Sequence, residues 1–279
     1  MTTTLRPTGP IQRQSDGGRS RLYEVCDNGR PVGRVTVAAV PSDGARVGTV
    51  RDLWIDEPSR RRGRGTIAAL AAEEVLRGWD CDTVQVSVPS GADAAARLAA
   101  ALGYTGTGRA MAKALDGPPP ALPPGTTHRP ISRGEYTAWA QSATEGYARA
   151  LAAHGLPLER ARAKAAADRA GVLPQGPDTP GVRLETLVHD GVPAGFLWLA
   201  PREVRPGERG MWVYDVMVAE EYRGRGHGRA LMLVAERCAL AAGLRLLGLH
   251  VFADNAPALR LYTSLGYRTV EVHHAKPLL

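Results

Sequence analysis

Two arginine- and glycine-rich segments, 163 residues apart, hold the residues best suited to chemistry in this chain of 279 residues. The first reads Arg60-Arg61-Arg62-Gly63-Arg64-Gly65, and the second reads Arg223-Gly224-Arg225-Gly226-His227-Gly228. Closely spaced glycines let successive backbone N–H groups converge on an anion at the start of a following helix. Neighbouring arginines add charge and paired hydrogen-bond donors. Both segments are predicted phosphate-binding turns, although a flexible surface turn can have the same composition.

The repeat extends beyond the two turns. Residues 52–115 align with residues 215–278 without a net gap, so that Leu102-Gly103-Tyr104 matches Leu265-Gly266-Tyr267. Neither turn contains the Gly-Lys-Ser/Thr of a Walker motif, and each follows a hairpin rather than the first strand of a dinucleotide-binding unit. We interpret the chain as two related domains whose differences show which one is active.

Further residues follow the second turn at fixed distances. Asp254-Asn255-Ala256-Pro257-Ala258 comes first, then Leu261-Tyr262 and a closing Leu-Gly-Tyr. Together with the Arg-x-x-Gly-x-Gly pattern of the turn, this ordered set resembles the GNAT superfamily of acetyl-coenzyme A-dependent N-acetyltransferases. The resemblance covers essentially all of residues 128–279 and is weaker over residues 20–115. The tandem layout is similar to that of mycothiol synthase-like proteins.

This resemblance implies that acetyl-coenzyme A is the co-substrate. Tyr262 would protonate the departing thiolate, which suits a phenol with a pKa of about 10. A strand edge would pair with the pantetheine arm, and the turn would hold the pyrophosphate. The implied coenzyme A-binding residues are Met217, Val218, Arg223, Gly224, Arg225, Gly226, His227, Gly228, Arg229 and Asn255. The first turn is either a second coenzyme A site, formed by Arg60, Arg61, Arg62, Gly63, Arg64 and Gly65, or a basic surface that binds nothing.

Two residues compete for the role of general base. His250 lies twelve residues before Tyr262, and a histidine with a pKa of about 6.5 can deprotonate an ammonium group directly or through water. Asp215 is the rival, but its equivalent in the first copy is Asp52, so it can equally be a residue that serves the fold. The structural alternatives are a hydrogen-bonded histidine in a buried strand and a core tyrosine on an amphipathic helix.

The first copy lacks the residues downstream of its turn. Ala99, Ala92 and Ser87 stand where the second copy has Tyr262, Asn255 and His250. We therefore expect direct acetyl transfer to a primary amine in the second copy alone. The alternative is a non-catalytic protein that senses coenzyme A or binds nucleic acid.

The expected fold class is α/β (α+β), with two tandem GNAT folds, each a mixed and mostly antiparallel central sheet flanked by helices. The Pro/Gly-rich residues 116–126 are a predicted linker between a truncated, degenerate domain at 1–115 and a complete catalytic domain at 127–279. Apolar spacing predicts two helices at about 133–154 and 158–170, and the first copy has no counterpart of this pair. The first domain is therefore expected to lack its N-terminal helical pair.

Composition limits the partners. The net charge of +7 comes almost entirely from arginine, and because its densest cluster is the glycine turn, nucleic acid is not required to explain it. There is no apolar run of membrane-spanning length and no apolar leader segment, and Cys26, Cys81 and Cys238 lie at wide, unpatterned spacing. We expect a cytoplasmic protein with reduced thiols and no metal. Its acceptor would be a small amine or a peptide amine, bound in a site lined by Tyr136, Trp139, Tyr147 and the loop at residues 173–181. A homodimer is compatible with the sequence.

Overall fold

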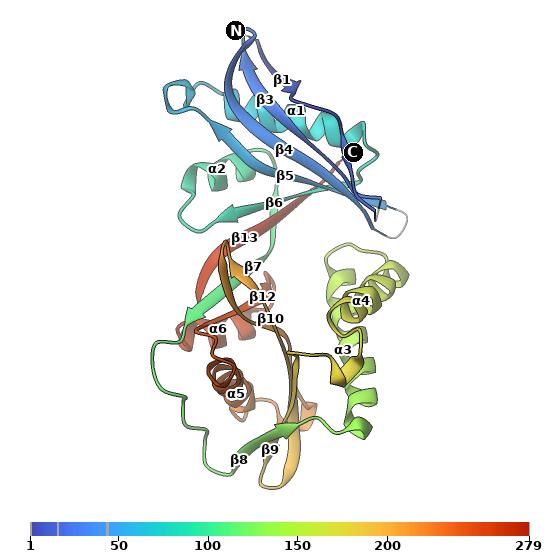
Figure 1. Cartoon of the computed structure of the whole chain (residues 1–279), viewed down its shortest axis with the longest axis vertical. Helices are drawn as coiled ribbons and strands as arrows, with labels where there is room; N and C mark the ends of the chain where they lie inside the picture. Colours follow the sequence, from blue (N-terminus) through green and yellow to red (C-terminus); the bar gives the residue numbers. More distant parts are fainter. Residues whose placement is uncertain (1, 16, 43–44, 279) are drawn as a thin grey trace. The chain divides into compact units, whose positions relative to one another are not determined.

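The computed structural model describes residues 2–15, 17–42 and 45–278 (Figure 1). The chain forms two compact units: unit 1 is Met1–Gly108 with Glu271–Leu279, and unit 2 is Arg109–Val270. Each unit is a mixed sheet covered by helices, which confirms the predicted α/β class. The two units do not divide the chain where the repeat does. Unit 1 includes strand residues 271–277 from the second copy, and unit 2 includes strand residues 109–114 from the first copy.

The sheet of unit 1 has the strand order β1-β3-β4-β5-β6-β13, with β2 beside β3. Its neighbouring strands are antiparallel, except that β5 and β6 are parallel. The elements are β1 (Thr3–Pro7), β2 (Gln12–Arg13), β3 (Arg19–Asp27), β4 (Arg30–Ser42), β5 (Ala45–Ile55), a 3-10 turn (Glu57–Ser59), α1 (Arg64–Arg77), β6 (Thr83–Pro89), α2 (Asp93–Ala101) and β13 (Arg268–Pro277).

The sheet of unit 2 has the order β7-β12-β11-β10-β9-β8, and β11 and β12 are its parallel pair. The elements are β7 (Thr105–Ala114), β8 (Thr126–Pro130), α3 (Arg133–Ala153), α4 (Leu158–Val172), a 3-10 turn (Gly176–Asp178), β9 (Arg183–His189), β10 (Val192–Arg205), β11 (Glu208–Val218), a 3-10 turn (Glu220–Tyr222), α5 (His227–Ala241), β12 (Leu246–Phe252) and α6 (Ala256–Ser264).

Hairpin turns and helix caps form where the residue types favour them. Asn28-Gly29 and Asp190-Gly191 close the equivalent hairpins β3–β4 and β9–β10, and all four residues have positive φ, as a type I′ turn requires. Helix α3 begins with a capping box, in which Ser132 and Glu135 satisfy each other's backbone N–H groups. Helix α4 follows its N-cap Pro157. Local sequence therefore fixes where these elements begin.

Alternate residues of β10 send side chains to opposite faces of the unit 2 sheet. Leu197 and Leu199 belong to the core that packs under α5, whereas Trp198 packs against Trp139 of α3 with ring centroids 5.7 Å apart. This alternation follows from the period of two along a strand. Between β1 and β3 of unit 1 the described residues form only the short β2, so the predicted loss of the helical pair is confirmed.

The exchanged strands are fixed by two equivalent ion pairs. In unit 2, Lys113 of β7 binds Glu236 of α5 at 2.6 Å. In unit 1, Lys276 of β13 binds Glu73 of α1 at 2.8 Å. Each glutamate is buried, and each ammonium group lies over a tyrosine ring as well. The strand that each half of the chain supplies thus satisfies a buried carboxylate in the other unit.

The predicted division at residues 115 and 126 follows chain order and stays a prediction. The segment between β7 and β8 does run without helix or strand, as its proline and glycine content indicates. In the described part of the chain, no helix has the length and apolarity needed to cross a membrane. The cytoplasmic location and the homodimer stay predictions.

Candidate active site

The second glycine turn has the geometry of an anion site. Gly226 is the N-cap of α5 with φ of +86°, and Gly224 has φ of +75°. These left-handed conformations suit glycine because a side chain would be strained there. The first N–H groups of α5 have no acceptor within the helix, so they are available to an anion, and the positive end of the helix dipole favours negative charge.

The first turn keeps nearly the same backbone. Gly63 is the N-cap of α1 with φ of +74°, and Arg61 has φ of +56° at the position of Gly224. The leading arginines also match, because Arg60 donates from Nε to the carbonyl of Ile55 at 2.7 Å and Arg223 donates to that of Val218 at 3.4 Å. Unit 1 thus retains the turn, and whether it binds coenzyme A stays a prediction.

Beyond the turn, β11 and β12 diverge. Among the described residues their parallel pairing ends at Val213 with Leu249, and the register of β10 with β11 shifts at the same level, next to Tyr214. Residues 214–218 therefore lie past the end of the ladder with β12, and that edge can accept an extended ligand as an added strand. The predicted residues Met217 and Val218 lie on this segment.

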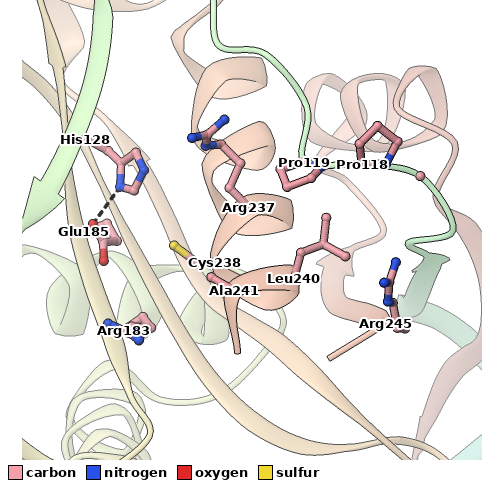
Figure 2. A pocket seen from close by; sticks show the side chains of 11 residues that line it. Pro118, Pro119, His128, Arg183, Glu185, Arg237, Cys238, Leu240, Ala241 and Arg245 are labelled. Carbon is pink, nitrogen blue, oxygen red and sulfur yellow. Dashed lines mark hydrogen bonds and ion pairs between the residues drawn. The ribbon is translucent and has the colours of Figure 1, made fainter. Parts of the chain in front are cut away.

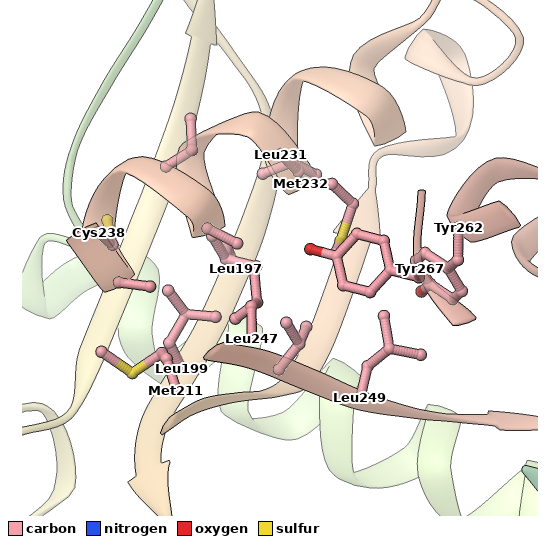
Figure 3. Close-up of a cluster of buried hydrophobic side chains, with 14 of the residues drawn as sticks. Leu197, Leu199, Met211, Leu231, Met232, Cys238, Leu247, Leu249, Tyr262 and Tyr267 are labelled. Carbon is pink, nitrogen blue, oxygen red and sulfur yellow. The ribbon is translucent and has the colours of Figure 1, made fainter. Parts of the chain in front are cut away.

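Tyr262 lies in the apolar core of unit 2, near enough to Asp215 to be influenced by the charge of that carboxylate. It is 9% exposed and its ring centroid lies 6.0 Å from that of Tyr267 (Figure 3). Burial, with a smaller contribution from the charge of Asp215, raises the pKa of Tyr262 to about 12. The phenol therefore stays protonated at neutral pH, as a general acid must. Tyr262 is therefore a core aromatic, and its role as the general acid stays a prediction.

Asp215 is held by a side chain from the other face of the sheet. Its Oδ2 accepts a hydrogen bond from Nε1 of Trp139 at 3.0 Å, and burial raises its pKa above the usual value. Asp52, the equivalent residue of unit 1, is exposed and has φ of +52°. Because the two carboxylates have such different surroundings, their shared identity does not mean a shared structural role.

His250 is exposed near the end of β12, so it is not the buried strand histidine considered above. Its ring packs edge-on against Phe252, with centroids 5.1 Å apart. The other side chains beside Phe252 are His154, whose ring stacks at 4.7 Å, and Tyr147, at 6.5 Å. His154 Nε2 lies 3.6 Å from a carboxylate oxygen of Asp254. These side chains surround Phe252, which lies on β12 beyond Leu249, where the described pairing with β11 ends.

Phe252 and His154 were not predicted as site residues from the sequence. Phe252 gives one signal, because it lies two residues after His250 and so shares its side of a strand. His154 gives none, since its partners are distant in the chain. Tyr147 was expected at the acceptor, and its hydroxyl lies 3.3 Å from Asp168. Burial and that carboxylate raise the pKa of Tyr147 to about 12.

Asn255 has a structural role in addition to the one predicted for it. Its side-chain oxygen accepts a hydrogen bond from the N–H of Ala258 at 3.1 Å and caps α6, the helix that carries Tyr262. In unit 1, Ala92 is at this N-cap and makes no side-chain cap, and the buried Ala99 replaces the tyrosine. A contact of Asn255 with coenzyme A stays a prediction.

The first residue of each phosphate-turn helix is buried against the hairpin turn of its own unit. In unit 1 this residue is Arg64, which forms an ion pair with Asp27. In unit 2 it is His227, whose ring lies 4.8 Å from that of His189. Burial, and then the charges of His189 and Arg225, lower the pKa of His227. The two turns therefore share a backbone but differ in the charges beneath them.

The sequence was compared with known protein families and with characterised relatives. The profile described as the acetyltransferase (GNAT) family matches residues 3–104 and 174–267, once in each half of the chain. A mycothiol acetyltransferase of Thermomonospora curvata is 31% identical over 93% of this chain and 84% of that one. A mycothiol acetyltransferase of Saccharomonospora viridis is 29% identical over 96% of this chain and 86% of that one.

Solved structures show the same fold. A GCN5-related N-acetyltransferase from Sphaerobacter thermophilus has a TM-score of 0.60 at 23% identity and covers 92% of this chain and 80% of that one. A tandem GNAT protein from the clavulanic acid biosynthesis pathway has a TM-score of 0.55 at 24% identity and covers 96% and 85%. Because the family profile matches both halves and covers more than half of the chain, the chain belongs to the acetyltransferase (GNAT) family, as a tandem N-acetyltransferase.

Proposed function

We propose that unit 2 transfers the acetyl group of acetyl-coenzyme A directly to a primary amine and that unit 1 is not catalytic. One observation carries the proposal: unit 2 combines its turn and open strand edge with a protonated phenol, Tyr262, and a nearby carboxylate, Asp215. Unit 1 has the turn, and its β5–β6 ladder also ends early, at Thr49 with Gln85. It has an alanine in place of the phenol.

The reaction requires two proton transfers. The base takes a proton from the ammonium group, and the free amine nitrogen forms a bond to the acetyl carbonyl carbon. The carbon–sulfur bond then breaks, and the thiolate takes the proton of the Tyr262 hydroxyl. Solvent returns that proton and removes the one held by the base. A direct transfer of this kind needs no covalent nucleophile, so the buried Cys238 has no part in it.

Asp215 is the base that we favour. Its burial raises its pKa toward the range in which a carboxylate accepts a proton at neutral pH, and its bond to Trp139 holds it in one orientation. His250 is the rival, and its exposed ring suits a relay through water. The two assignments predict different behaviour of the Asp215→Asn and His250→Gln variants.

The acceptor proposal rests on the side chains beside the open strand edge. Phe252, Tyr147 and His154 supply ring faces, and Asp254 is an exposed carboxylate. Aromatic faces and carboxylates attract a cationic ammonium group. The acceptor is therefore a small amine or a peptide amine. The amine that the mycothiol acetyltransferase relatives acetylate is the first one to assay.

Substitution of Tyr262 by phenylalanine tests the proposal, and Tyr267→Phe is a matched control. Both phenols are buried in the same cluster, but Tyr267 has no hydrogen-bond partner for its hydroxyl among the described residues. We expect Tyr262→Phe to lower turnover about 100-fold or more with little change in acetyl-coenzyme A binding. Tyr267→Phe should keep its turnover. Equal rates in the two variants would remove Tyr262 as the acid.

A further inference from the structure

Unit 2 contains a cavity that is separate from the proposed transfer site. It has a volume of about 460 Å³ and lies between the segment that precedes β8, the strand β9 and the C-terminal half of α5 (Figure 2). Cys238 is eleven residues after the first residue of α5, which places it roughly 16 Å along the helix from the phosphate turn. A group bound here would not touch the reacting atoms.

Three potential metal ligands converge at this cavity. Nδ1 of His128 lies 2.9 Å from Oε2 of Glu185. One ring nitrogen of His128, one carboxylate oxygen of Glu185 and Sγ of Cys238 all lie within 4.8 Å of one another. Figure 2 shows the sulfur directed toward the histidine and glutamate pair. Glu185 is 5% exposed and Cys238 is 7% exposed, so two of the three ligands are buried.

The equivalent positions of unit 1 show that the fold does not need polar groups here. The offsets of the repeat place Leu5, Tyr23 and Val75 where unit 2 has His128, Glu185 and Cys238. Tyr23 is in the buried apolar core of unit 1, and Leu5 and Val75 are partly buried against it. Unit 1 therefore packs apolar side chains at the three positions where unit 2 has polar side chains, two of them buried.

We propose that His128, Glu185 and Cys238 bind a zinc ion. Imidazole, carboxylate and thiolate are the ligand types that zinc prefers. Tetrahedral bonds of roughly 2.0–2.3 Å place donor atoms about 3.3–3.6 Å apart, so the His128 and Glu185 donors would separate by a few tenths of an ångström and donors at the 4.8 Å limit would approach by about 1 Å. The two anionic ligands balance the charge of the ion, and a bound ion takes the proton off a thiol outright. The nearby Arg237 donates to the carbonyl of Pro120 at 3.0 Å.

The ion would act as a structural clamp. Its ligands come from β8, β9 and α5, so it would tie the edge of the unit 2 sheet to the helix that carries the phosphate turn. We expected no metal from the sequence because the three cysteines follow no metal-binding pattern, and His128 and Glu185 lie 110 and 53 residues before Cys238. Only the folded chain brings them together.

Cobalt(II) is a suitable probe, since it occupies zinc sites and absorbs light. We expect the full-length protein, freed of metal with a chelator, to develop a thiolate-to-cobalt charge-transfer band that zinc then abolishes. Cys238→Ser should lose the band, whereas Cys81→Ser, which changes a buried cysteine of unit 1, should keep it. Circular dichroism would establish that each variant is folded. A wild-type protein without the band at saturating cobalt, or the same band in Cys238→Ser, would overturn the proposal.

A second measurement does not depend on the spectrum. Zinc at a hundred times its dissociation constant should shift the folding equilibrium of wild-type protein about 100-fold, and so raise its melting temperature. The variant His128→Leu introduces the residue that unit 1 has at this position and should show no zinc-dependent shift. An equal shift in His128→Leu would show that zinc binds elsewhere.

Discussion

The indole Nε1 of Trp139 donates a 3.0 Å hydrogen bond to Oδ2 of Asp215. Trp139 is 1% exposed and lies on α3, one of the two helices that unit 1 lacks. The helical pair therefore orients the carboxylate as well as covering one face of the sheet. This dependence explains why the carboxylate of Asp52 has no comparable setting, although the residue type is the same in both copies.

The first prediction separates the two candidate bases. Asp215→Asn removes the charge but keeps an oxygen that can accept the Trp139 hydrogen bond, so the fold should be retained. We expect turnover to fall about 100-fold or more at saturating acetyl-coenzyme A, while His250→Gln should retain most of its activity. Steady-state kinetics with a primary amine measures both. Activity that survives Asp215→Asn and is lost in His250→Gln would transfer the role to His250.

The second prediction concerns the stability of unit 2 as the pH changes. Burial raises the pKa of Asp215 above its usual value of 3.8, so the folded state binds this proton more tightly than the unfolded state does. The stabilisation is complete below pH 3.8 and is lost as the pH rises through the raised pKa. Asp215→Asn has no such loss. In urea unfolding, the free energy of unfolding of Asp215→Asn minus that of wild type should therefore increase as the pH rises. A decrease in this difference with rising pH would contradict the prediction.

Much of this arrangement could be predicted from local sequence. Glycines at turns, Asn-Gly and Asp-Gly at hairpins, and the order of residues after the second turn indicated the elements and the repeat. The pairing of Trp139 with Asp215 could not be predicted, because it joins residues 76 apart through the packing of a helix on a sheet. The exchange of strands between the two halves could not be predicted either. Lys113 and Lys276 are equivalent in the alignment whichever unit their strands complete.

The third prediction uses the natural difference between the two turns. Gly224→Arg gives the second turn the residue that Arg61 supplies in the first, at the same left-handed conformation. We expect a loss of about 1–2 kcal/mol in the stability of unit 2, because the side chain meets the backbone strain that glycine avoids. Arg61→Gly should relieve that strain in unit 1. Chemical denaturation of both variants measures the effect, and a second turn as stable with arginine as with glycine would contradict the argument.

The fourth prediction tests the exchanged strands. Lys276→Met leaves the carboxylate of Glu73, whose side chain is 1% exposed, without its cation and should cost unit 1 about 3–5 kcal/mol. Hydrogen exchange should therefore increase in α1 of unit 1, although residue 276 is near the C-terminus. The matched variant Lys113→Met removes the cation beside Glu236 and should loosen α5 of unit 2 instead. Loosening of α5 by Lys276→Met would show that the strand belongs to unit 2.

The last prediction concerns the charges beneath the phosphate turns. Burial lowers the pKa of His227, so the unfolded state binds its proton more readily than the folded state does. This contribution to stability is present above pH 6.5 and is lost as the pH falls through the lowered pKa. Unit 1 has the Arg64–Asp27 ion pair at this place.

Between about pH 8 and pH 5, His227 should thus make unit 2 lose stability relative to unit 1, in the direction opposite to the contribution of Asp215. His227→Gln should reduce the difference, because glutamine carries no charge at either pH. Unfolding followed by hydrogen exchange distinguishes the two units through peptides of α5 and α1. If α1 instead opened first on acidification, the buried His227 would not be the weak point. Acetyl-coenzyme A, which should bind this turn through its pyrophosphate, is expected to protect α5.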